Sequence, residues 1–161
     1  MQRAAVAKTS YSDEELALKS RYFAQMLQSI ELLHRRFLDV ITAELGRREK
    51  ALSAVQALIL SHASDRPLSL GQLQALGHYE GTNLSYNVGK LAESGFIILS
   101  RPEWDKRSSV IELTAEGQEV ASLIARTIDE HSASLASIGI TGDELSLLTR
   151  TLKGLHRLWS A

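Results

Sequence analysis

The segment that most constrains the fold is Asp13–Leu45, which contains neither glycine nor proline. Ser12 and Glu15 form an S-x-x-E capping box at its start, and apolar residues then recur mostly at steps of three and four. The pattern predicts one amphipathic helix about 50 Å long, at about 1.5 Å per residue. A helix of this length needs a partner helix along much of it. Its apolar stripe comprises Phe23, Met26, Ile30, Leu33, Phe37, Val40 and Leu45.

Two more capping boxes follow in the middle of the chain. Ser53 pairs with Gln56 and Ser69 with Gln72, each at the three-residue spacing that satisfies two orphan N–H groups at a helix start. They predict helices over residues 54–63 and about 70–76.

The next segment combines a helix with a hairpin. Leu84, Val88 and Leu91 recur at spacings of four and three and predict a helix over residues 82–94, after which Gly95 ends it. The β-rich runs at 96–99 and 109–113 are joined by a polar segment and predict a hairpin. Three short helices followed by a hairpin form the layout of a winged helix-turn-helix.

The last third of the chain returns to helical patterns. Thr114 can cap one striped helix, Gly139 interrupts the pattern, and Thr141 with Glu144 opens another. These helices and the first one offer more apolar surface than a small central core can cover, so we expect them to form a dimerisation region. The alternative is that they wrap around that core.

The expected fold is therefore mainly α (α+β), a winged helix-turn-helix with N- and C-terminal helices that dimerise. The expected division is a flexible N-terminus (1–12), a dimerisation helix (13–50), the winged module (51–113) and C-terminal dimerisation helices (114–161), together one domain over about 13–161.

The order and spacing of several short motifs resemble the MarR family, dimeric winged-helix transcription factors. Residues Leu73, Leu84, Val88, Leu91, Gly95 and Phe96 fall at the family's spacing, Asp105-Lys106-Arg107 matches its D-x-R wing motif, and Leu113-Thr114-Ala115-Glu116-Gly117 matches its L-T-x-x-G motif. The resemblance implies a homodimer that binds a pseudo-palindromic double-stranded DNA operator and regulates transcription, as a repressor. It departs from the family at Gln74, Tyr86 and Gly89, and Lys90 is the one cation of the predicted recognition helix.

The candidate DNA contacts lie on the recognition helix and the wing. With the apolar stripe turned inward, we expect the polar side chains of the helix to reach base edges or phosphates in the major groove. Capping of the helix is the alternative for Thr82 and Asn83. The resemblance implies that Arg107 contacts DNA and that Asp105 orients the wing through an ion pair, whereas a solvated hairpin tip is the alternative. The candidates are Thr82, Asn83, Ser85, Tyr86, Asn87 and Lys90 on the helix and Arg101, Lys106 and Arg107 on the wing; Trp104 is either a wing anchor or folded onto the domain.

Charge weakens the electrostatic case for DNA binding. The whole chain carries a net charge of −1, and residues 51–113 hold five cations against six anions. Binding DNA therefore requires the anions to lie on the far side, with Arg47, Arg48 and Lys50 adding to the phosphate-facing surface. A winged-helix module for protein–protein contact, without specific DNA binding, is the alternative function.

The resemblance also implies a cleft for a small aromatic ligand between the dimerisation helices and the winged module. We expect Phe37, Leu38, Thr42, Leu58, His62 and Ile124 to line it, with plain core packing as the alternative.

Other function classes find little support in the sequence. The five histidines show no metal-binding spacing, and no nucleophile elbow or phosphate-binding glycine loop occurs, so we expect no catalytic residues, metal or cofactor. The chain has no cysteine, which excludes disulfides and thiol-based redox sensing. No run of about 18 apolar residues is present, so we expect a cytoplasmic protein without a membrane span.

Overall fold

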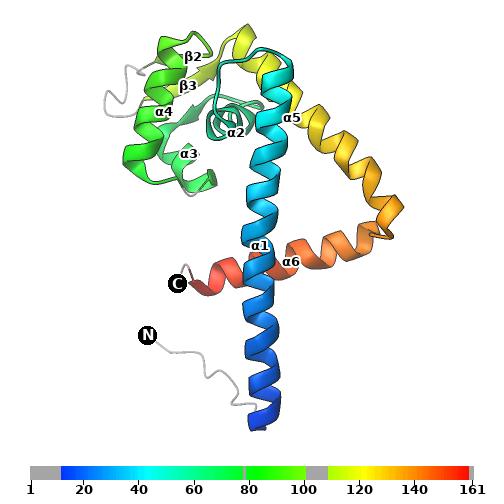
Figure 1. Cartoon of the computed structure of the whole chain (residues 1–161). Helices are drawn as coiled ribbons and strands as arrows, with labels where there is room; N and C mark the ends of the chain where they lie inside the picture. The colour runs from blue at the N-terminus through cyan, green and yellow to red at the C-terminus, as the bar shows by residue number, and fades with distance from the viewer. Residues whose placement is uncertain (1–11, 78, 101–108, 160–161) are drawn as a thin grey trace, which may run out of the picture.

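The computed structural model describes residues 12–77, 79–100 and 109–159. A long helix, α1, stands beside a compact winged module, and the last two helices lead away from that module and back toward α1 (Figure 1). The elements are α1 (Asp13–Arg47), α2 (Ala54–His62), β1 (Leu68–Ser69), α3 (Leu70–Gly77), α4 (Gly81–Glu93), β2 (Ile97–Ser100), β3 (Val110–Leu113), α5 (Ala115–Ser134), the 3₁₀ turn η1 (Leu135–Ile138) and α6 (Gly142–Trp159).

Helix α1 confirms the long predicted helix. The side chain of Ser12 accepts a hydrogen bond from the Glu15 N–H at 3.2 Å, and a Glu15 carboxylate oxygen accepts from the Ser12 N–H at 3.1 Å. The helix continues one residue past Gly46 before it ends. Among its residues, only Ile41 and Leu45 are buried, both near its C-terminal end. Helix α1 is therefore anchored at one end and exposed along the rest.

The winged module holds the hydrophobic core. Its three-stranded antiparallel sheet has the order β1-β3-β2, with Leu68 opposite Ile111 and Ile97 opposite Leu113. The antiparallel pairing of β2 with β3 confirms the two predicted strands of the hairpin, whereas the two-residue strand β1 was not predicted because it is too short to carry a pattern. The largest fully buried core side chains come from strand β3 and from helices α1, α2, α3, α4 and α5: Ile41, Leu45, Ile59, Leu60, Leu73, Leu91, Ile111, Val120 and Ile124.

The junction between the wing and α5 explains the L-T-x-x-G motif. Thr114 caps α5, because its hydroxyl accepts from the Gly117 N–H at 3.2 Å and donates to the Gly95 carbonyl at 2.7 Å. The Thr114 N–H donates to the Phe96 carbonyl at 3.1 Å. A Cβ on buried Gly117 would clash with that same carbonyl oxygen. The glycine is required because α5 starts directly against the backbone of the wing.

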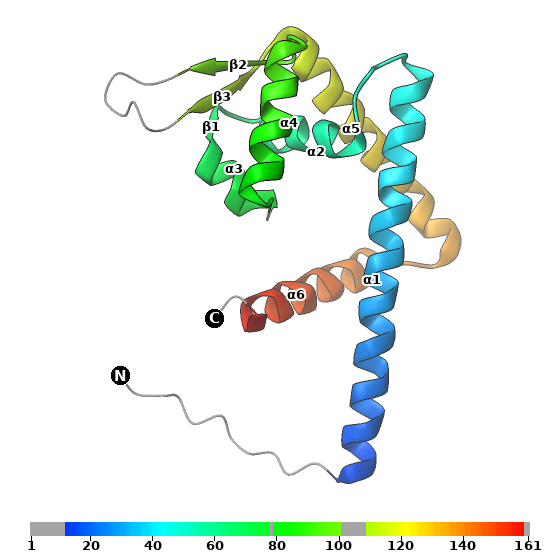
Figure 2. The same ribbon diagram turned by 60° about the vertical axis from the view of Figure 1, so that its left-hand side comes forward.

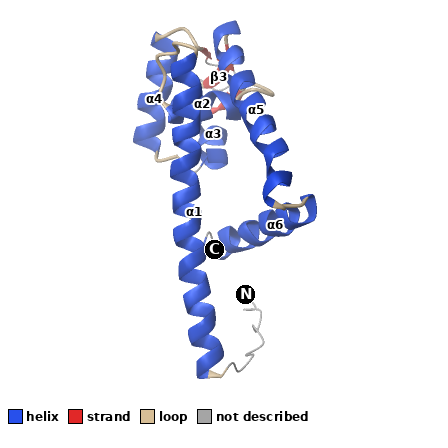
Figure 3. Cartoon of the chain, turned by 45° about the vertical axis from the view of Figure 1, so that its right-hand side comes forward, coloured by secondary structure: helices blue, strands red, loops and turns tan. Residues whose placement is uncertain are grey.

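The end of α5, η1 and α6 extend away from the core. Gly139 takes a positive φ of 75° after η1, and the Thr141–Glu144 box then starts α6, which passes back toward α1 (Figure 3). The ring of Trp159 meets that of Phe23 edge-on, with 5.9 Å between centroids. No residue of α6 is buried. No helix among the described residues is long and apolar enough to cross a membrane.

Candidate nucleic-acid interface

Helix α4 lies at the surface of the winged module, next to the hairpin (Figure 2). Leu84, Val88 and Leu91 are buried in the core, as the sequence predicted. The helix is capped by the backbone of Glu80 without a side-chain bond, so Thr82 and Asn83 lie inside the first turn and do not cap it. The exposed side chains of its outer face are Thr82, Asn83, Ser85, Tyr86 and Lys90.

Asn87 does not face outward, and this part of the prediction is wrong. Asn87 is only 8% exposed. Its side-chain nitrogen donates to the backbone carbonyl of Asn83 at 2.9 Å and to Asn83 Oδ1 at 2.6 Å. The buried arc of α4 is wider than its three apolar residues, and Asn87 lies at its edge. The hydrogen bonds offset the cost of burying the amide.

The charge on α4 is largely neutralised. The ammonium of Lys90 lies 2.7 Å from the carboxylate of Glu93 on the same helix, and that hydrogen bond raises the pKa of Lys90. Because an exposed ion pair of this kind contributes little free energy, Lys90 can leave Glu93 and bind a DNA phosphate at little cost in stability. The wing candidates Arg101, Lys106 and Arg107, together with Asp105 and Trp104, lie outside the described residues.

Lys50 does not join a phosphate-facing surface, contrary to expectation. Its ammonium contacts the carboxylates of Glu116 at 3.0 Å and Glu119 at 2.8 Å on α5. The bond with Lys50 lowers the pKa of Glu119, and the bond with Glu119 is the main cause of the raised pKa of Lys50. Lys50 therefore ties the end of α1 to the start of α5.

A histidine–tyrosine contact at the helix-turn-helix turn was missed by the sequence analysis. The hydroxyl of Tyr79, just before α4, lies 3.1 Å from His62 Nδ1 at the end of α2. Partial desolvation lowers the pKa of His62 and raises the pKa of Tyr79. The Tyr79 ring covers Gly77 so closely that a Cβ there would clash with it. The sequence signal for this contact is Gly77, two residues before Tyr79, because a glycine leaves room for a following aromatic ring to pack against the backbone.

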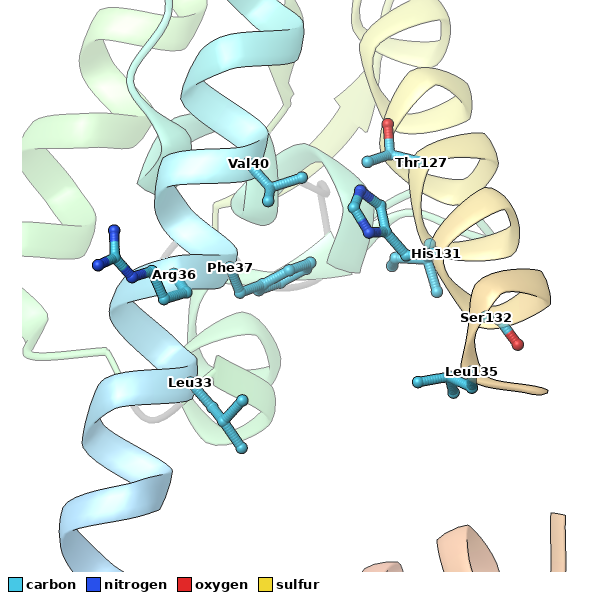
Figure 4. A pocket seen from close by; sticks show the side chains of 9 residues that line it. Leu33, Arg36, Phe37, Val40, Thr127, His131, Ser132 and Leu135 are labelled. Carbon is cyan, nitrogen blue, oxygen red and sulfur yellow. The ribbon is translucent and has the colours of Figure 1, made fainter. Parts of the chain in front are cut away.

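A cavity of about 470 Å³ separates α1 from α5 (Figure 4). Of the six predicted ligand-site residues, only Phe37 lines it. Ile124 is fully buried in the core, Leu38 and Leu58 pack against the core, and Thr42 is exposed, while His62 contacts Tyr79. The cavity is lined by Leu33, Arg36, Phe37, Val40, Thr127, Ile128, His131, Ser132 and Leu135. No group of three or more His, Asp or Glu side chains within the described ranges could hold a metal ion.

Comparison with known proteins agrees with this geometry. Residues 52–117 match the family "Winged helix DNA-binding domain". A structure of a MarR family transcriptional regulator from Listeria monocytogenes, complexed with 26mer DNA, aligns with a TM-score of 0.72 and 24% identity, over 81% of this chain and 86% of the other. The chain has the MarR fold. The fold that the resemblance in the sequence implies is thus confirmed.

Two further relatives of this MarR-fold chain come from other bacteria. Staphylococcus aureus MarR, in complex with salicylate and kanamycin, aligns with a TM-score of 0.71 and 19% identity, over 89% of this chain and 95% of the other. The exopolysaccharide II synthesis transcriptional activator ExpG of Rhizobium meliloti (strain 1021) is 28% identical over 139 residues, which cover 86% of this chain and 71% of ExpG.

Proposed function

We propose that the protein is a dimeric, sequence-specific DNA-binding regulator of transcription that acts in the cytoplasm. Helix α4 enters the major groove, and the wing over residues 96–113 reaches the neighbouring minor groove. The observation that carries the proposal is the division of α4 into a buried apolar side and an exposed polar side. This division matches what a recognition helix requires, because the apolar side holds the helix on the domain while the polar side reads base edges.

The dimer rests on exposed apolar side chains of α1 and α6. Along α1, Leu16, Tyr22, Phe23 and Leu33 are exposed, and no side chain of α6 is buried within a single chain. A soluble monomer rarely leaves apolar surface of this extent uncovered. A second copy bound to these faces places the two α4 helices in positions related by a twofold axis. This arrangement suits two DNA half-sites about one helical turn apart.

A small aromatic ligand suits the cavity between α1 and α5. Its lining is mostly apolar. The imidazole of His131 faces the space between the two helices, whereas the guanidinium of Arg36 points away from α5 (Figure 4) and lies 3.4 Å from the carboxylate of Asp39. Such a lining fits a small aromatic molecule, with its ring on Phe37 and a polar group near His131. The ligand acts by favouring one spacing of the two α4 helices over another.

The test combines the size of the protein with its DNA preference. Light scattering gives the molecular mass, and selection from a randomised duplex library gives the preferred site. We expect a dimer, a twofold-related site, and affinity that falls steeply with salt because phosphate contacts release counterions. Tyr86→Ala, which removes a side chain on a residue 65% exposed on α4, should weaken binding by about tenfold. Thr149→Ala, an exposed polar position on α6, serves as the matched control.

Other outcomes point elsewhere. A dimer that enriches no duplex favours the protein–protein module, and equal binding to every duplex contradicts sequence-specific regulation. A reporter gene behind the selected site distinguishes the repression expected from the sequence from the activation named for ExpG.

A further inference from the structure

Two asparagines form a hydrogen-bonded ladder along α4. Asn83 and Asn87 are four residues apart, so their side chains lie one above the other on one face of the helix. Asn87 is buried and Asn83 is exposed. The side-chain nitrogen of Asn87 bonds to both the backbone oxygen of Asn83 and its side-chain oxygen, at 2.9 and 2.6 Å.

The backbone carbonyl settles how both amides are oriented. A carbonyl oxygen can only accept a hydrogen bond, so the Asn87 atom beside it is the NH₂ group. The Asn83 side-chain atom beside that same NH₂ group is then the acceptor Oδ1. The oxygen of Asn83 therefore faces Asn87, and its own NH₂ group faces away. That NH₂ group has no hydrogen-bond partner among the residues that the structure describes.

We propose that Asn87 is a positioning residue that makes Asn83 a donor-only reader of the DNA, selective for guanine over adenine. This inference rests on the proposed function and names one of its specificity determinants. Guanine presents two acceptors, N7 and O6, in the major groove, which suit two outward N–H donors. Adenine is usually bound by asparagine through a donor and an acceptor together. The ladder turns the acceptor toward Asn87 and so disfavours that second mode.

The experiment is duplex selection with the full-length protein and its variants, followed by affinity measurement on the selected site. For the wild type we expect guanine at one position of each half-site, preferred over adenine by about tenfold, the effect of one good base contact. Asn83→Ala should abolish that preference at the same position. Asn87→Leu and Asn87→Ala free the Asn83 amide to turn, so adenine should come within about twofold of guanine there.

A control separates specificity from stability. Val88→Ala shortens a buried side chain next to the ladder, so it should lower the melting temperature and leave the base preference unchanged. Circular dichroism establishes that each variant is folded. The side chains of Asn87→Leu and Asn87→Ala differ in size, so the test can be completed if either of these two variants folds.

The outcomes distinguish the inference from the function beneath it. Adenine at the Asn83-dependent position of the wild type, or an unchanged preference in a folded Asn87 variant, overturns the inference. Enrichment that Asn83→Ala does not alter also overturns it while the proposed function stands. A wild type that enriches no duplex overturns both.

Discussion

The substitution Gly117→Ala tests how closely the wing packs on α5. The added methyl group would lie closer than 3.0 Å to the Phe96 carbonyl oxygen and 3.2 Å from its carbonyl carbon. Backbone atoms on both sides form the contact, so no side chain can turn away to relieve it. We estimate that the wing strand and α5 must separate by about 1 Å to restore an ordinary contact.

That displacement has a calculable consequence. The Phe96 carbonyl accepts the Thr114 N–H at 3.1 Å, and moving it about 1 Å takes this bond beyond hydrogen-bonding range. Losing one hydrogen bond costs about 1 kcal/mol, and overpacking a close contact costs about 1–3 kcal/mol. We therefore expect Gly117→Ala to destabilise the fold by about 2–4 kcal/mol. The melting temperature should fall by about 5–10 °C for a chain of this size.

The control is the same substitution at Gly89, in the interior of α4, where a Cβ meets nothing within 4 Å. Gly89→Ala should stabilise the helix by about 0.5–1 kcal/mol, because alanine loses less backbone entropy. Thermal unfolding at one fixed protein concentration measures both changes, since dimer stability depends on concentration. Equal melting temperatures for Gly117→Ala and the wild type would refute the steric reasoning.

Three further results are expected. Because desolvation lowers the pKa of His62, the unfolded chain binds a proton at this residue more readily than the folded chain, so the free energy of unfolding should fall as the pH drops below about 6.5. In His62→Gln, the midpoint of urea unfolding should therefore change less between pH 7.5 and 5.5 than in the wild type, and an equal change in both proteins contradicts this reasoning. Leu148→Arg on α6 should shift the mass from dimer to monomer in light scattering, whereas a stable dimer places the interface elsewhere. Salicylate, used as an aromatic probe of the proposed ligand site, should raise the melting temperature, and His131→Ala should weaken that stabilisation; equal stabilisation removes His131 from the ligand site.

Local signals were the most reliable guide to the fold. The capping boxes at Ser12, Ser53, Ser69 and Thr141 are all present, because each depends on residues only three apart. The apolar stripe of α4 was also sufficient to predict its buried side.

Features that depend on packing between distant segments were less accessible. Asn87 lies about 40° around α4 from Leu91, and only the neighbouring elements decide whether that edge is covered. The cavity lies between α1 and α5, nearer the C-terminal end of α5 than expected, and Leu58 and His62 of α2, which were also expected to line it, do not. Apolar stripes show which faces of two helices meet, but not where the helices diverge.

The continuity of α1 has a mechanical consequence for the proposed dimer. One end of this helix is fixed in the winged module by Ile41 and Leu45, and its exposed remainder offers the seat for a second copy. Its span of about 50 Å makes it a lever without a hinge. Tilting that lever by about 4° moves its far end by about 3.5 Å, which is close to the 3.4 Å rise between neighbouring bases. A slight change in the angle between two subunits is thus enough to shift the two α4 helices out of register with their half-sites.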